Sequence, residues 1–167
     1  MKALACLLSL LFAAYADAAV FMTPDEADGA RHALERTLAT VHEQLLIITP
    51  KLDAGLWERS LLKALKNGTK VTVVTSDPPG DGAAALARFK YVEVRTASGL
   101  SAPDYGGALS LTLVIADGTT ACRGTLPLTR QQMEHDLGMF ECSDREIAAH
   151  IKTAERIVAR SRPYLEE

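Results

Sequence analysis

Helical segments alternate with short apolar strands over the first two thirds of this chain, and this alternation limits the fold more than any other feature of the sequence. The expected strands are rich in β-branched residues and end at turn-forming residues such as Pro50 and Gly80. They cover residues 45–49, 70–75 and 92–95, and the helices between them cover residues 55–66 and a short alanine-rich segment that ends near Phe89. Helices that alternate with short buried strands predict an α/β layered domain.

Helix-start signals flank this central region on both sides. Thr23 is followed by Pro24 and, three residues after the threonine, by Glu26, which predicts a capping box and a helix that runs to about His42. Ser143 has Glu146 three residues later, which predicts a second capping box and a last helix that runs to about Arg162.

Two further strands are expected in the second half of the chain, over residues 109–116 and 119–123. They are joined at Asp117-Gly118, which is the strongest short hairpin signal in the sequence. Residues 137–141 have the composition of one more strand, and we expect the glycine-containing loop over residues 97–107 to be mobile.

The N-terminus has the pattern of a cleavable signal peptide over residues 1–18. Lys2 precedes an apolar run, and a small-residue stretch follows that permits cleavage after Ala16 or after Ala18. A membrane anchor would need about 20 apolar residues, and this run is shorter. No later segment is apolar enough to span a bilayer, so the sequence predicts a secreted or periplasmic protein whose mature part, residues 19–167, is a single domain.

Charge and cysteine content narrow the function further. The net charge is −3, and the sequence has no run of Lys and Arg that would indicate a nucleic-acid partner. Cys122 and Cys142 remain after processing, and in an oxidising compartment they favour a disulfide over two buried free thiols. The sequence contains no zinc-ligand spacing, no phosphate-binding glycine loop and no nucleophile elbow, so we expect no metal and no cofactor.

The order of elements and certain residues resemble the phospholipase D superfamily, in its small single-domain secreted nuclease type. Residues 44–75 resemble the first half of that domain, which is followed by a hairpin carrying His-x-Lys-x4-Asp-x6-Gly-[Ser/Thr]-x-Asn. The matching stretch, residues 110–127, keeps Asp117, Gly124 and Thr125. The resemblance implies a layered sandwich in which helices flank a mixed central β-sheet with this hairpin at its centre. The alternative is an α/β domain of another family, because Asp117-Gly118 suits any tight hairpin.

The most specific residues of the family motif are absent. Ser110 stands at the position of the histidine, Thr112 at that of the lysine, and Pro127 at that of the asparagine. In the family the histidine is the nucleophile and the lysine neutralises phosphate charge. A serine with no adjacent base is a weak nucleophile at neutral pH, and threonine has no positive charge to offer. The motif is therefore degenerate, and the resemblance does not extend to the family's chemistry.

Two functions remain from this reading. The first is a non-catalytic phospholipase D-like domain that acts as a binding or assembly module. The second is a phosphodiesterase or nuclease-type hydrolase that uses other residues or a partner chain carrying the full motif. The family brings two motif copies together, so the resemblance implies a homodimer, or a heterodimer with a related chain. Other candidates are better explained as surface or packing residues: His32, His42, Trp57, the pair His135-Asp136, and His150.

Overall fold

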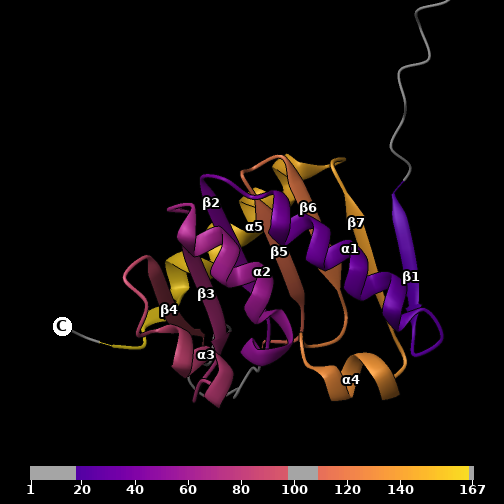
Figure 1. Ribbon diagram of the computed structural model, residues 1–167, viewed down its shortest axis with the longest axis horizontal. Helices are drawn as coiled ribbons and strands as arrows, with labels where there is room; N and C mark the ends of the chain where they lie inside the picture. Colours follow the sequence, from indigo (N-terminus) through magenta and orange to yellow (C-terminus); the bar gives the residue numbers. More distant parts are fainter. Residues whose placement is uncertain (1–17, 98–108, 166–167) are drawn as a thin grey trace, which may run out of the picture.

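The structure, a computed structural model, describes residues 18–97 and 109–165. These residues form one eight-stranded mixed sheet in the order β1-β7-β6-β5-β2-β3-β4-β8, with helices on both faces (Figure 1). In chain order the elements are β1 (Ala19–Thr23), α1 (Ala27–Thr40), β2 (Gln44–Ile48), α2 (Ala54–Lys66), β3 (Lys70–Ser76), α3 (Asp81–Leu86), β4 (Val92–Ala97), β5 (Thr112–Ala116), β6 (Thr120–Gly124), α4 (Arg130–His135), β7 (Gly138–Ser143), α5 (Ile147–Arg160) and β8 (Arg162–Pro163). The layered α/β sandwich expected from the sequence is confirmed.

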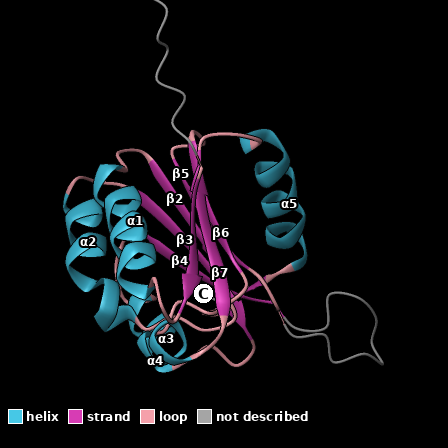
Figure 2. Cartoon of the chain, turned by 90° about the vertical axis from the view of Figure 1, so that its right-hand side faces the viewer, coloured by secondary structure: helices cyan, strands magenta, loops and turns pink. Residues whose placement is uncertain are grey.

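The sheet separates two hydrophobic cores of unequal size. Figure 2 shows α1 and α2 on one face of the sheet and α5 on the other. Neighbouring residues of the central strands enter opposite cores: Ile47 and Val73 pack on the α1 and α2 side, and Ile48 and Val74 on the α5 side. Side chains alternate across a strand, so a strand buried on both faces is apolar at nearly every position.

The strands that carry the expected hairpin lie at the centre of the sheet. β2, β3 and β4 are parallel to one another, whereas β5 is antiparallel to β2, and β6 is antiparallel to β5. The turn between β5 and β6 has positive φ angles of 50° at Asp117 and 65° at Gly118. These are the angles for which Asn, Asp and Gly are preferred, which is why this dipeptide marks the turn in the sequence.

The first helix begins later than the sequence predicted. Thr23 is the last residue of β1, and its hydroxyl donates to the carbonyl of Asp136 rather than capping a helix. Glu26 is the N-cap residue of α1, and its carboxylate accepts the backbone N–H of Met22 at 2.7 Å. The predicted capping box is wrong here because Thr23 pairs with Gly138 in a strand that local patterning did not reveal.

The second capping box is also wrong, and a short helix was missed. Ser143 ends β7 and its hydroxyl accepts the N–H of Arg145, while the N-cap of α5 is Glu146 in a left-handed conformation. The additional helix, α4, is only six residues long and has Thr129 as its N-cap. Except for Ala97, which ends β4, the loop expected to be mobile lies outside the described residues.

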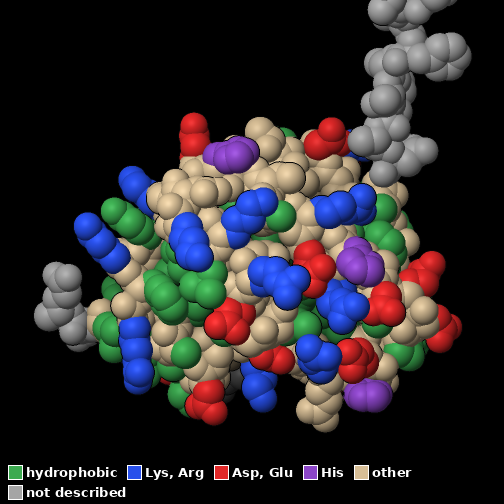
Figure 3. All heavy atoms as spheres, in the orientation of Figure 1, with side chains coloured by type: hydrophobic (Ala, Val, Ile, Leu, Met, Phe, Trp, Pro, Cys, Tyr) green, Lys and Arg blue, Asp and Glu red, His purple; other side chains and the backbone are tan. Residues whose placement is uncertain are grey.

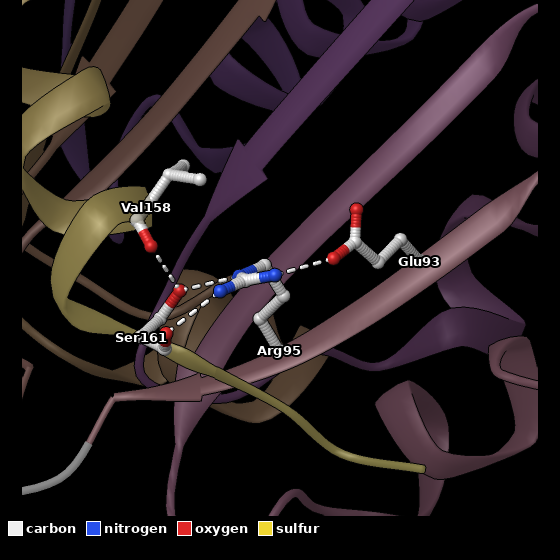
Figure 4. A network of polar contacts seen from close by, with 4 residues as sticks. All are labelled: Glu93, Arg95, Val158 and Ser161. Atoms are coloured by element: carbon white, nitrogen blue, oxygen red, sulfur yellow. Dashed lines mark hydrogen bonds and ion pairs between the residues drawn. The ribbon is translucent and has the colours of Figure 1, made fainter. Parts of the chain in front are cut away.

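A polar network fixes the C-terminal end of α5 to β4 (Figure 4). The guanidinium of Arg95 donates to the hydroxyl and to the carbonyl oxygen of Ser161, each at 2.7 Å, and to the carboxylate of Glu93 at 2.5 Å. The Ser161 hydroxyl in turn donates to the carbonyl of Val158. A cation next to the last carbonyls of a helix is favoured by the helix dipole, so this contact helps to hold α5 on the sheet.

Candidate functional site

Most of the residues at degenerate motif positions lie together at one end of the sheet. Ser110 is exposed and precedes β5, Thr112 begins β5, and Gly124 pairs with Thr112 at the end of β6. Thr125 and Pro127 follow directly in the connection to α4. Asp117 lies at the other end of β5. It is five residues from Thr112, which is about 17 Å at the usual rise of about 3.4 Å per strand residue.

Thr112, which the sequence resemblance places at the lysine position, forms a buried pair with Thr49. Thr112 is 1% exposed, and its hydroxyl donates to the carbonyl of Leu126 at 2.6 Å. The hydroxyl of Thr49, which is fully buried just after β2, lies 3.0 Å from that of Thr112. Thr49 also donates to the carbonyl of Lys51 and accepts the N–H of Leu128.

These contacts give the threonine pair a structural role. They tie the ends of β2 and β5 to the segment that follows β6, and they satisfy polar groups that would otherwise be buried without partners. Both hydroxyls are closed to solvent and bonded to the backbone. They are therefore not oriented to bind a phosphate. Sequence reasoning missed Thr49, whose only signal was a polar residue at the end of an apolar strand.

The matched glycine and hydroxyl positions also serve packing and backbone pairing. A Cβ at Gly124 would come within 2.4 Å of the Phe140 ring, so only glycine allows this aromatic side chain to pack here. The Thr125 hydroxyl accepts the N–H of Met139 at 3.0 Å, and the Thr125 N–H donates to the carbonyl of Met139. The Pro127 carbonyl accepts the N–H of Thr129.

Asp117 anchors the loop between α1 and β2 to the hairpin. One carboxylate oxygen accepts the N–H groups of Glu43 and Gln44 at 2.8 and 3.0 Å, and the other accepts that of His42 at 2.9 Å. Burial raises the pKa of Asp117, but the hydrogen bonds from Gln44, Glu43 and His42, together with the charge of His42, lower it below its ordinary value overall. The carboxylate is thus bound to backbone donors as an anion.

The two cysteines form a disulfide between directly opposed residues of β6 and β7. Cys122 pairs with Cys142 in the strand register, their Cα atoms are 4.0 Å apart, and the S–S distance is 2.07 Å. Cys122 is fully buried, and its sulfur lies 3.4 Å from the Thr37 hydroxyl of α1. The bridge expected from the sequence is present.

The other candidate side chains do not gather at this end of the sheet into a catalytic arrangement. His135 ends α4 and Asp136 follows it, both exposed, while His42 uses its backbone N–H to bind Asp117. Trp57 is buried and donates from its indole N–H to the carbonyl of Leu128, which agrees with a packing role. Within residues 18–97 and 109–165, no group of three His, Cys, Asp or Glu side chains is placed to hold a metal ion.

A polar cavity of about 640 Å³ lies between the N-terminal ends of α2, α3 and α4, and its lining includes Lys51, whose carbonyl accepts the Thr49 hydroxyl. Its charged lining residues are two cations, Lys51 and Arg130, and three carboxylates, Asp53, Asp81 and Asp136. Asp53 is already engaged as the N-cap of α2. The formal charge of these five side chains is therefore 2 − 3 = −1.

Comparison with solved structures shows which known proteins share this architecture. NucT from Helicobacter pylori aligns with a TM-score of 0.79 at 16% sequence identity, over 87% of this chain and 98% of that chain. Nuc from Salmonella typhimurium, a phospholipase D family member, aligns with a TM-score of 0.69 at 16% identity, over 89% and 98%. The fold is that of the phospholipase D superfamily.

A larger enzyme contains the same unit. Phosphatidylserine synthase from Haemophilus influenzae aligns with a TM-score of 0.64 at 17% identity, over 90% of this chain but only 41% of that chain. No protein-family model matches the sequence of this chain, and no curated protein sequence matches it either. The likeness to the phospholipase D superfamily is thus one of fold, found by comparison of structures and not by comparison of sequences.

Proposed function

We propose that this chain is a member of the phospholipase D superfamily that has lost the family's phosphodiester chemistry and acts as a binding or assembly module. The observation that carries this proposal is that Thr112 is buried, uncharged and hydrogen-bonded to the backbone. Where the family has a charged lysine, this chain has a buried hydroxyl that donates to the backbone carbonyl of Leu126. Phosphoryl transfer depends heavily on electrostatic stabilisation, and this position supplies no positive charge.

The nucleophile position supports the same conclusion. Ser110 is exposed two residues before β5, and among the described residues no hydrogen bond joins it to a histidine. His42 lies near Asp117 at the opposite end of β5. A serine hydroxyl needs an adjacent base to attack a phosphodiester at neutral pH.

A phosphodiesterase assay on the purified mature protein tests this proposal. With single-stranded DNA, double-stranded DNA and bis(p-nitrophenyl) phosphate as substrates, we expect hydrolysis at the rate of a Ser110→Ala variant. Ser60→Ala, a half-buried serine on α2, provides the matched control. Turnover that disappears in Ser110→Ala but persists in Ser60→Ala would identify an active enzyme and refute the proposal. Activity that appears only after addition of a motif-bearing homologue would favour the shared-site alternative.

We also propose that the protein works outside the cytoplasm after removal of residues 1–18. The disulfide supports an oxidising compartment, and β1 begins at Ala19, directly after one of the two expected cleavage positions. Among the described residues, the helices are too short or too polar to cross a membrane. Intact-mass measurement of the exported protein should give a chain that begins at Asp17 or Ala19, and retention of residues 1–16 would refute secretion by cleavage.

Self-association or pairing with a related chain is the third part of the proposal. It rests on the fold shared with Nuc and NucT and on the paired motifs that the family resemblance implies. A dimer of identical chains would use the same surface on both copies. Light scattering after size-exclusion chromatography should give twice the mass of the mature chain. A monomer at all concentrations would exclude the homodimer and leave only a related chain as partner.

A further inference from the structure

A basic and aromatic surface lies at the end of the sheet opposite to the threonine pair. It consists of the C-terminal half of α2 and the turn that precedes β4, and its exposed residues are Lys63, Lys66, Arg88, Phe89, Lys90 and Tyr91. We call it the α2–β4 patch. Figure 3 shows Lys and Arg side chains around hydrophobic ones at the left of this face, over these two elements.

The topology brings the two segments of the patch together. β3 and β4 are parallel neighbours, so the end of α2, which leads into β3, and the turn that leads into β4 reach the same end of the sheet. The backbone confirms this contact, because the carbonyl of Tyr91 accepts the N–H of Val71 at 2.8 Å. The residues at motif positions near Thr112 lie at the other end of these strands, beside the end of β2.

The charge of this region is opposite to that of the whole chain. Residues 59–92 contain six basic residues and two acidic ones, a net charge of 6 − 2 = +4, whereas the whole chain carries −3. The two acidic residues, Asp77 and Asp81, follow β3 and begin α3 at the far end of the sheet. Within the described part of the chain, none of the four cations of the patch pairs with a carboxylate.

Large apolar side chains are exposed among the four cations of the patch. Phe89 is 42% exposed and Tyr91 is 46% exposed, on a single turn, and Leu62 and Leu65 are half-buried on the adjacent helix. The Lys90 ammonium lies 5.2 Å from the centroid of the Tyr91 ring. An aromatic pair flanked by lysines can insert into the interface of a bilayer, while the lysine stems extend along apolar surface and keep their charges at the headgroups.

We propose that the α2–β4 patch docks the protein on a bilayer that contains anionic phospholipids. Protruding aromatic side chains on one turn, next to half-buried leucines, suit insertion into a bilayer interface better than stacking against successive bases, which uses aromatic platforms along a charged groove. The docking surface is independent of the lost catalysis, because it lies at the opposite end of the sheet from Ser110 and Thr112.

Vesicle flotation with the exported, processed protein tests this proposal. The protein should float with vesicles that contain about 30% phosphatidylglycerol and remain unbound with pure phosphatidylcholine. The triple variant Lys63→Gln, Lys66→Gln, Lys90→Gln should reduce the partition coefficient about 100-fold, since each basic residue near an anionic surface contributes about 1 kcal/mol. The matched control is Lys152→Gln, Arg156→Gln, Arg160→Gln, which removes the same charge from the exposed side of α5 and should bind nearly as the wild type does.

A second pair of variants tests the aromatic contribution. Phe89→Ser should weaken vesicle binding at least tenfold, whereas Leu137→Ser, at an 80% exposed apolar residue outside the patch, should not. Equal losses in the two triple variants would reduce the effect to net charge and overturn the proposal. Binding to single-stranded oligonucleotides that depends on the patch, without vesicle binding, would also overturn it in favour of a nucleic-acid surface. Circular dichroism of each variant confirms that the fold is retained.

Discussion

Replacement of Asp117 by asparagine tests whether its carboxylate anchors the loop between α1 and β2 to the hairpin. Asparagine tolerates the positive φ of 50° at this position, so the backbone of the turn is retained. Its single carbonyl oxygen can still accept the N–H groups of Glu43 and Gln44, which both bond to the same oxygen of the carboxylate. The N–H of His42 would then face the amide NH₂ group and lose its acceptor.

The expected cost follows from these contacts. One hydrogen bond to a charged group is lost and two others lose the charge of their acceptor, in a half-buried setting where water can partly replace them. We therefore expect the free energy of unfolding to fall by about 1.5 to 2 kcal/mol, which corresponds to a fall in Tm of roughly 3 to 8 °C for a domain of this size. Urea unfolding at pH 7 measures the change, with the exposed Asp144→Asn as control.

The dependence on pH adds a second test. Because the folded state lowers the pKa of Asp117, its carboxylate stabilises the fold fully above the ordinary aspartate pKa of about 3.9. This contribution is lost as the pH falls through the lower folded-state pKa. The stability difference between wild type and variant should thus be constant near neutral pH and shrink in acid. A difference below about 0.5 kcal/mol at pH 7, the range of neutral surface substitutions, would refute the anchoring role.

Three further changes test the contacts that hold the fold. Thr112→Val should destabilise by about 1 to 2 kcal/mol in urea unfolding, because it leaves the half-buried carbonyl of Leu126 without its donor and removes the neighbour of the buried Thr49 hydroxyl. Thr72→Val on the half-buried face of β3 should stay within about 0.5 kcal/mol. Reduction of the disulfide, which joins residues 20 apart, should lower stability by about 3 kcal/mol; an unchanged Tm after reduction would contradict this. Arg95→Ala should increase hydrogen exchange in α5 by removing its contacts with Ser161, and unchanged exchange there would show that packing alone holds the helix.

The sequence determined the elements whose signals are local. The leucine spacing of α2, the β-branched run of β3 and the Asp117-Gly118 turn each depend on residues within a few positions of one another. Helix periodicity and turn chemistry are properties of a single segment, so they can be recognised without knowing which segment packs against it. The motif spacing alone also led to the expectation that Thr112, an uncharged residue, stands where the resemblance implies a lysine.

Tertiary structure decided the features that depend on distant partners. Thr23 has the neighbours of a helix cap, yet it forms a strand because β7, more than 100 residues later, supplies its partner Gly138. The role of Thr112 depends on Thr49 and Leu126, which the sheet brings together from three separate segments. The α2–β4 patch likewise exists only because parallel β3 and β4 bring their preceding segments to one end of the sheet. Strand pairing joins residues that carry no local signal of their partner. The sequence therefore defined the individual helices, strands and turns, and the pairing of strands defined the contacts of Thr112 and the α2–β4 patch.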